Sequence, residues 1–130
     1  MHRTILVMML AAMSNSAMAE WVVITDRKAD SLTVYADPTT ILKTGNKVKM
    51  WSLWDFIQTQ VSTNDDKYQS IMAQEEYDCK EDQRRTLFLI YRAENMGEGT
   101  TVVSYNRPHS DWEPAPPKSM TNSLLKFACQ

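Results

Sequence analysis

Six short runs of β-branched, aromatic and aliphatic residues set the fold class of this 130-residue chain. They cover residues 21–25, 32–36, 47–56, 68–79, 85–92 and 100–106. Turn-forming residues lie between them, among them Asp37-Pro38, Gly45-Asn46 and Gly97-Glu98-Gly99. Runs of this length, separated by turn signals, are typical of antiparallel strands joined by hairpins. The pattern therefore predicts a single, mainly β domain.

A short helix is predicted to follow the strands. Three prolines between residues 114 and 117 indicate an extended connection, and Ser119 is a residue type that caps helix N-termini. From there, apolar side chains recur at helical spacing, at Met120, Leu124, Phe127 and Ala128. The predicted class is therefore α+β, with one helix at the C-terminal end.

Two predicted strands are apolar on both faces. Leu87 and Leu89 alternate with Phe88 and Ile90, and residues 48–53 show the same pattern. Such a strand is normally buried on both sides, so the second face must meet another layer. Either part of this face is an association surface for a partner subunit, or the strands close into a barrel or sandwich with every apolar side chain inside.

Residues 1–19 have the features of a secretory signal peptide. The basic residue Arg3 precedes an apolar stretch at 5–13, and Ala17-Met18-Ala19 provides small residues at a cleavage site. The apolar stretch is shorter than the roughly 20 residues that cross a bilayer. We expect residues 1–19 to be removed and residues 20–130 to form the exported domain. Because Glu20, not a cysteine, follows the cleavage point, no lipid anchor is expected.

The charge of the exported domain argues against nucleic acid as a partner. Removal of Arg3 leaves 13 of the 14 Lys and Arg residues against 16 Asp and Glu, a net charge of −3. Proteins that bind a nucleic-acid backbone are normally basic. No later apolar run is long enough to span a membrane.

Cys79 and Cys129 are the two cysteines, and export places both in an oxidising compartment. The simplest pairing is one disulfide; a free thiol or an intermolecular bond is the alternative. In the chain-entropy model, closing a loop of about 50 residues stabilises a fold by roughly 4 kcal/mol. The sequence does not support a zinc site, because His109 is the one histidine of the exported part and no further ligand lies at a suitable spacing.

The sequence gives little support for catalysis. The best candidates for acid–base catalysis are Glu75, Glu76 and Asp78. Of these, Glu76 and Asp78 share a face of a predicted strand at about 7 Å, within the broad range of inverting glycosidases, but acids are common on solvated strand faces. His109 lies in a polar stretch without triad partners. Gly97 and Gly99 are explained by a hairpin turn better than by a phosphate-binding loop. We expect no catalytic residue, metal site or cofactor.

The candidate partner-binding residues are aromatic or basic. Trp54 and Trp112 stand beside acids and could present an edge to a protein ligand, although packing in the core is the plainer interpretation. Arg84 and Arg85 open one strand and Arg107 follows the next, which gives a basic rim on an acidic domain. Such a rim commonly discourages strand addition, but an acidic protein segment or a polysaccharide could bind it.

Several short segments, in this order, resemble the surface-adhesin protein E family. They are Tyr35-Ala36-Asp37-Pro38, Gly45-Asn46-Lys47-Val48 leading into Met50-Trp51, Tyr68-Gln69-Ser70, Tyr77-Asp78-Cys79, Met96-Gly97-Glu98-Gly99, Trp112-Glu113-Pro114 and Cys129. The resemblance implies a single antiparallel sheet of about six strands with a C-terminal helix pinned to one face by a Cys79–Cys129 disulfide. It also implies a homodimer formed through the sheet.

For function, the resemblance implies an adhesin that holds host extracellular-matrix and serum proteins such as vitronectin, laminin and plasminogen. We therefore expect a non-catalytic binding protein of the bacterial cell envelope, in the periplasm, on the surface or secreted. The alternative is a soluble periplasmic structural or inhibitory factor that acts on an envelope component. The expected lack of a lipid anchor favours this alternative.

Overall fold

A computed structural model describes residues 19–27 and 31–130 of the chain. The predicted signal peptide lies outside the described residues, except for Ala19. The elements, in chain order, are β1 (Val22–Arg27), β2 (Leu32–Thr44), β3 (Lys47–Val61), β4 (Lys67–Asp78), β5 (Gln83–Arg92), the 3-10 turn η2 (Asn95–Gly97), β6 (Thr101–Asn106), β7 (Glu113–Pro114) and α1 (Met120–Ala128). All six predicted strand regions are therefore strands.

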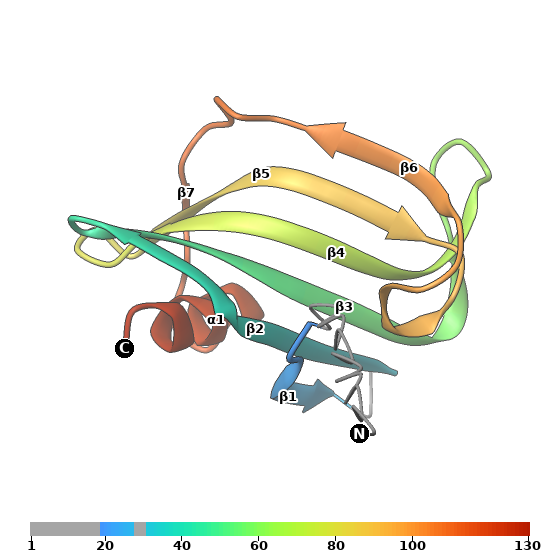
Figure 1. Cartoon of the computed structure of the whole chain (residues 1–130), viewed down its shortest axis with the longest axis horizontal. Coiled ribbons are helices and arrows are strands. Elements are labelled where there is room, and N and C mark those ends of the chain that lie inside the picture. Colours follow the sequence, from blue (N-terminus) through green and yellow to red (C-terminus); the bar gives the residue numbers. More distant parts are fainter. Residues whose placement is uncertain (1–18, 28–30) are drawn as a thin grey trace, which may run out of the picture.

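The strands form one twisted antiparallel sheet in the order β1-β2-β3-β4-β5-β6, and the short β7 pairs with the start of β5 (Figure 1). Within the described residues the sheet neither closes on itself nor packs on a second sheet. The single-sheet fold is confirmed, and the barrel or sandwich alternative is wrong for this chain.

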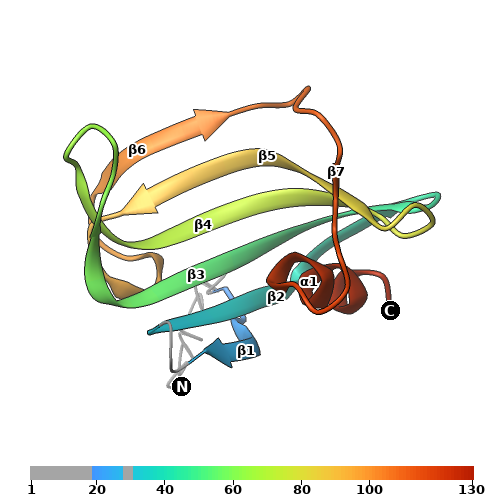
Figure 2. The same cartoon turned by 180° about the vertical axis from the view of Figure 1, so that it is seen from behind.

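The helix α1 lies on one face of the sheet, near β2 and β3, while β6 forms the sheet edge farthest from it (Figures 1 and 2). The Ser119 hydroxyl accepts a hydrogen bond from the backbone N–H of Asn122 at 3.1 Å, which confirms the predicted N-cap. The core lies between helix and sheet and includes Val34, Ala36, Val48, Met50, Tyr77, Leu124, Leu125 and Ala128. We call this side of the sheet the helix face.

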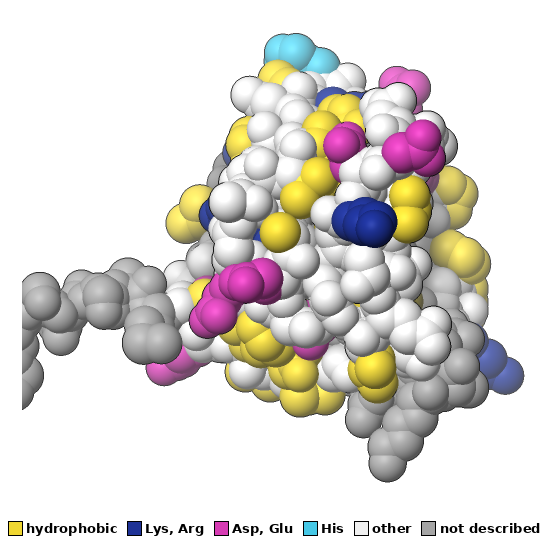
Figure 3. Space-filling view, turned by 90° about the vertical axis from the view of Figure 1, so that its right-hand side faces the viewer, with side chains coloured by type: hydrophobic (Ala, Val, Ile, Leu, Met, Phe, Trp, Pro, Cys, Tyr) yellow, Lys and Arg dark blue, Asp and Glu magenta, His cyan; other side chains and the backbone are white. Residues whose placement is uncertain are grey.

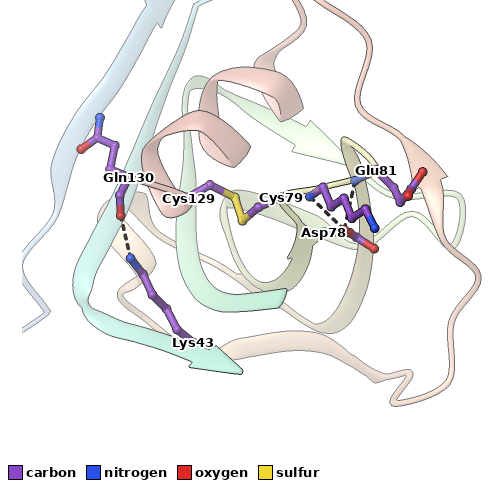
Figure 4. Close-up of a disulfide and its surroundings, with 7 residues drawn as sticks. Lys43, Asp78, Cys79, Glu81, Cys129 and Gln130 are labelled. Atoms are coloured by element: carbon purple, nitrogen blue, oxygen red, sulfur yellow. Dashed lines mark hydrogen bonds between the residues drawn. A yellow bond between two sulfur atoms is a disulfide. The ribbon is translucent and has the colours of Figure 1, made fainter. Parts of the chain in front are cut away.

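The disulfide ties α1 to the sheet. Cys79 directly follows β4 and Cys129 ends α1, and their sulfur atoms are bonded at 2.01 Å (Figure 4). Neither cysteine is free. Beside the disulfide, the Lys43 ammonium donates to the carbonyl oxygen of Gln130 at 2.6 Å. The last residues of the chain are thereby held against both β2 and the end of β4.

The predicted turn at Asp37-Pro38 is wrong, because β2 continues through it as a bulge. Asp37 pairs with Trp51 and Leu42 pairs with Lys49, so several residues of β2 oppose one residue of β3. The Thr40 hydroxyl replaces the lost backbone partner and accepts from the backbone N–H of Trp51 at 2.9 Å. The local turn signal therefore bends the strand without ending it.

The opposite side of the sheet, which we call the helix-free face, is partly covered by the chain itself. Strand alternation places Leu53, Met72 and Ile90 on this side. The η2 turn packs on Met72 and Leu53, as the close approach at Gly97 shows. Trp21, just before β1, lines a hollow together with Met72 and Ile90. The second apolar layer predicted for the central strands is thus supplied in part by these two segments.

Candidate functional site

Part of the helix face is concave, because α1 packs mainly on β1 to β4 and leaves much of β5 and β6 open. Two adjoining pockets lie there. The inner pocket, of about 210 Å³, is lined by Trp54, Ile71, Ala73, Glu75, Arg84, Thr86, Leu89 and Thr121. The outer pocket, of about 240 Å³, is lined by Arg84, Thr86, Leu89, Arg107, Ser110, Asp111 and Glu113. They share three residues and form a continuous hollow from α1 to the sheet edge.

Strand register explains why these residues meet. Side chains two apart on a strand share a face, so Ala73 and Glu75 of β4 both point toward the α1 side. Their partners on β5 are Leu89 and Thr86. The register shifts by one residue between these two pairs, and Leu87 is the extra residue. This bulge keeps Thr86 and Arg84 on the helix face, where they line the inner pocket.

Glu75 is a buried acid in this mostly apolar inner pocket. Its residue is 5% exposed, and its Oε2 atom lies 3.5 Å from the Arg84 Nε atom without forming a hydrogen bond. Burial raises the pKa of Glu75 to about 7, while Arg84 lowers it and Glu113 raises it. Desolvation is therefore stronger than the attraction of the neighbouring guanidinium.

Arg84 is held mainly by groups other than Glu75. Its Nη1 donates to the Thr86 hydroxyl at 2.8 Å, and its Nη2 lies 3.3 Å from a carboxylate oxygen of Glu113. Glu113 reaches this position because β7 pairs with β5 at Arg84. The short β7, which the sequence did not predict, therefore builds the edge of the hollow.

A row of four half-buried aromatic rings continues outward from the pockets across β3, β4, β5 and β6. Phe56 and Tyr68 have ring centroids 6.1 Å apart, Tyr68 and Tyr91 4.7 Å, and Tyr91 and Tyr105 6.0 Å. The Arg107 guanidinium lies 5.4 Å from the Tyr105 ring centroid. Burial, together with Tyr68 and Tyr105, raises the pKa of Tyr91. We call Phe56, Tyr68, Tyr91 and Tyr105 the aromatic row.

Three of the five predicted partner-binding residues meet on this surface. Trp54 and Arg84 line the inner pocket, and Arg84 and Arg107 line the outer one. Arg85 and Trp112 lie elsewhere. The Arg85 side chain points to the helix-free side, where its Nη2 is 2.6 Å from Glu76 Oε1 and its guanidinium stands 4.7 Å from the Trp112 ring centroid. The side chains of the two consecutive arginines thus lie on opposite faces of the sheet.

The weak catalytic candidates have structural roles. Glu76 pairs with Arg85, and Asp78 Oδ1 accepts from the backbone N–H groups of Lys80 and Glu81 at 3.0 and 3.1 Å. His109 lies exposed in a turn after β6. Among the described residues, no three His, Cys, Asp or Glu side chains are placed to hold a metal ion.

Sequence reasoning missed the role of Glu75 in the inner pocket. The signal was present, because Glu75 occupies the period-two position between Ala73 and Tyr77 on a strand face that is otherwise apolar. An acid at such a position indicates either that the strand face is assigned wrongly or that the acid is buried beside groups that stabilise it. The aromatic row was missed for another reason, since its members are far apart in sequence.

Comparison with known proteins identifies the family of the chain and solved structures with a similar fold. The sequence profile of the surface-adhesin protein E family matches residues 21–130. The chain belongs to the surface-adhesin protein E family. No curated protein resembles the sequence closely enough to count as a match. Among the described residues, no helix is long and apolar enough to cross a membrane.

Solved structures of protein E from Haemophilus influenzae resemble this family member in fold. One, in its second crystal form, has a TM-score of 0.56 at 11% identity and covers 74% of this chain and 79% of its own. Another, from a non-typeable strain, has a TM-score of 0.55 at 12% identity and covers 82% of this chain and 74% of its own. At such low identity the similarity shows a shared surface-adhesin protein E fold, and side-chain roles do not transfer.

Proposed function

We propose that this chain is a non-catalytic, adhesin-like binding protein of the cell envelope that recognises proteins through the aromatic row and the adjoining pockets. The aromatic row carries the proposal. Half-exposed tyrosine, tryptophan and arginine side chains are the residues that contribute most to protein interfaces, because they bury large areas at low cost in side-chain entropy. A surface with four such rings in contact is costly to leave in water and well suited to a partner.

The charges around this surface are mixed, because Arg84, Arg107, Asp111 and Glu113 all line the outer pocket. Figure 3 shows the end of the molecule that carries η2 and the β3–β4 connection, where hydrophobic side chains form separate patches between acidic and basic ones. A partner would therefore be recognised through local apolar contacts and individual ion pairs more than through the electrostatic field of one large charged patch.

Family membership supports host extracellular-matrix and serum proteins as the partners. The test is binding of the purified protein to immobilised vitronectin, laminin and plasminogen, with serum albumin as the control surface. We expect saturable binding to at least one of the three and none to albumin. Failure to bind all three would remove the support for host matrix and serum proteins as ligands.

The location of the protein is part of the same proposal. We place it at the cell surface or in the medium after cleavage between residues 19 and 20, with a soluble periplasmic factor as the alternative. Protease treatment of intact cells, followed by mass measurement of the mature chain, separates the two. Digestion on intact cells, or recovery of the mature chain from the medium, supports the adhesin, whereas full protection and recovery in the periplasmic fraction support the periplasmic factor.

We also propose a homodimer through the sheet. Val23 on the edge strand β1 is 56% exposed, and Trp51, Phe88 and Ile90 remain half-buried on the helix-free face. Light scattering across a concentration series should give twice the monomer mass at high concentration. A monomer mass throughout would contradict the dimer without affecting the binding surface on the helix face.

A further inference from the structure

The inner pocket holds a carboxylate that is poorly satisfied by its own chain. Among the described residues, the Glu75 Oε2 atom is buried and has no hydrogen-bond partner, and the facing Arg84 Nε also has none. A buried carboxylate without hydrogen bonds costs free energy unless a suitable partner group reaches it. Because Glu75 also lines the inner pocket, a small rotation of its carboxylate would bring this oxygen to a group that enters from the open side.

The charge balance around Glu75 favours a cation. Arg84 stands between two acids, at 3.5 Å from Glu75 and 3.3 Å from Glu113, so one positive charge faces two negative charges when Glu75 is ionised. Arg84 directs its Nη groups to Glu113 and Thr86, away from Glu75. When Glu75 is ionised, the three-residue cluster thus has one negative charge in excess at the pocket and its rim.

The lining of the inner pocket favours a cation that is attached to an aliphatic chain. Trp54, Ile71 and Leu89 line the pocket together with Ala73 and the Thr121 side of α1. A volume of about 210 Å³ corresponds to roughly seven water-sized volumes of about 30 Å³ each. A side chain that carries several methylenes and ends in an ammonium group matches both this size and this lining, and an aromatic wall adds cation–π attraction.

We propose that the inner pocket binds a lysine side chain of a bound protein segment, with its ammonium group at the Glu75 carboxylate and its methylenes against Trp54 and Leu89. This inference rests on the proposed function, because it assumes that the partner is a protein. Beyond that function, it specifies that the partner contributes a lysine side chain and that Glu75 recognises its ammonium group.

The pocket should bind lysine in a pH-dependent way. The charged or titratable groups near Glu75 are Arg84 from β5, Glu113 from β7 and Tyr77 from β4 itself, while α1 contributes the uncharged Thr121. Because burial brings the pKa of Glu75 to about 7, the carboxylate is mostly protonated at pH 6 and mostly ionised at pH 8. The lysine ammonium stays charged over this range. Affinity should therefore rise roughly tenfold from pH 6 to pH 8, in proportion to the ionised fraction.

The test is a titration of the ¹⁵N-labelled protein with Nα-acetyl-lysine methylamide, followed by NMR chemical shifts. We expect saturable shifts of the residues that line the inner pocket at pH 8 and roughly tenfold weaker binding at pH 6. The same probe with its ε-amine acetylated has no charge and should not bind. Glu75→Gln should abolish binding at both pH values, whereas Glu98→Gln, the same change at an exposed acid, should leave it as in wild type.

Three results would overturn the lysine pocket: equal binding of the neutral probe, unchanged binding by Glu75→Gln, or no binding of the lysine probe at pH 8. The small probe also separates this inference from the proposed function. Protein binding without probe binding would reject the lysine pocket alone. Probe binding without any protein binding would reject the proposed function and, with it, the assignment of the lysine to a protein segment.

Discussion

At the scale of single residues, Glu75 is the side chain whose environment departs most from its ordinary state. It sits on an apolar strand face between Ala73 and Tyr77, and burial holds its pKa near 7. Its folded-state pKa therefore lies above the ordinary value of 4.5, and the folded protein binds this proton more tightly than the unfolded chain does. The stabilisation from the bound proton is fully present below pH 4.5 and is lost as the pH rises through about 7.

Glu75→Gln should make the unfolding free energy less dependent on pH. The two pKa values, 4.5 and about 7, correspond to about 3 kcal/mol of stability that the wild type loses between pH 4 and pH 8 and the variant does not. Urea unfolding at pH 4, 6 and 8 measures this difference, with Glu98→Gln as the matched control. Parallel pH profiles for wild type and Glu75→Gln would show that Glu75 is not buried as described.

Residue types in the sequence were enough to select Trp54, Arg84 and Arg107, but not to place them together. Alternation along a strand put Arg84 and Arg85 on opposite faces, and this follows from the sequence once the strand is assigned. Which of the two arginines faces α1 does not follow from alternation alone, because the bulge at Leu87 shifts the register between β4 and β5. The basic rim that the sequence indicated is therefore divided between two sides of the sheet.

At the scale of elements, strand positions were predictable because β-branched and aromatic runs alternate with turn residues, whereas strand ends were not. Asp37-Pro38 has the composition of a turn, yet β2 continues because its later residues still pair with β3. The two-residue β7 has no sequence signal, since it forms only where the chain passes β5 on its way to α1. Long-range pairing decided both cases.

The disulfide should contribute much of the stability that holds α1 on the sheet. The bond joins residues separated by 50 positions, for which the chain-entropy model gives roughly 4 kcal/mol. The double variant Cys79→Ser with Cys129→Ser should lose about this much unfolding free energy in guanidinium denaturation. Reduction of the wild type should give the same loss, and a loss below about 1 kcal/mol would contradict the role assigned to the bond.

The η2 turn should depend on Gly97. This glycine has φ +71°, and a Cβ there would lie 2.9 Å from Met72 Sδ. Gly45, in the β2–β3 hairpin, is a matched control because it has φ +60° and open space around it. Thermal unfolding should show a loss of about 1 kcal/mol for Gly45→Ala and a larger loss for Gly97→Ala. Equal losses would mean that the contact with the sheet does not constrain this turn.

At the scale of the whole molecule, one sheet supports two surfaces with different coverage. The helix-free face is partly covered by η2 and Trp21, and the helix face is covered by α1 over β1 to β4. The uncovered remainder of the helix face collects the two pockets and the aromatic row. Because the described residues form no second sheet, a large aromatic surface stays open, as the proposed protein-binding role requires.

The most direct test of this account is partner binding by two variants of β5, Tyr91→Ser and Phe88→Ser. Both replace a half-exposed aromatic ring on the same strand, but Tyr91 belongs to the aromatic row and Phe88 contacts Trp51 on the helix-free face. With the matrix or serum protein that the wild type binds, Tyr91→Ser should weaken affinity by roughly 30-fold, as for an interface hot spot, and Phe88→Ser by less than about threefold. Loss of binding in Phe88→Ser with wild-type affinity in Tyr91→Ser would place the interface on the helix-free face and contradict the account.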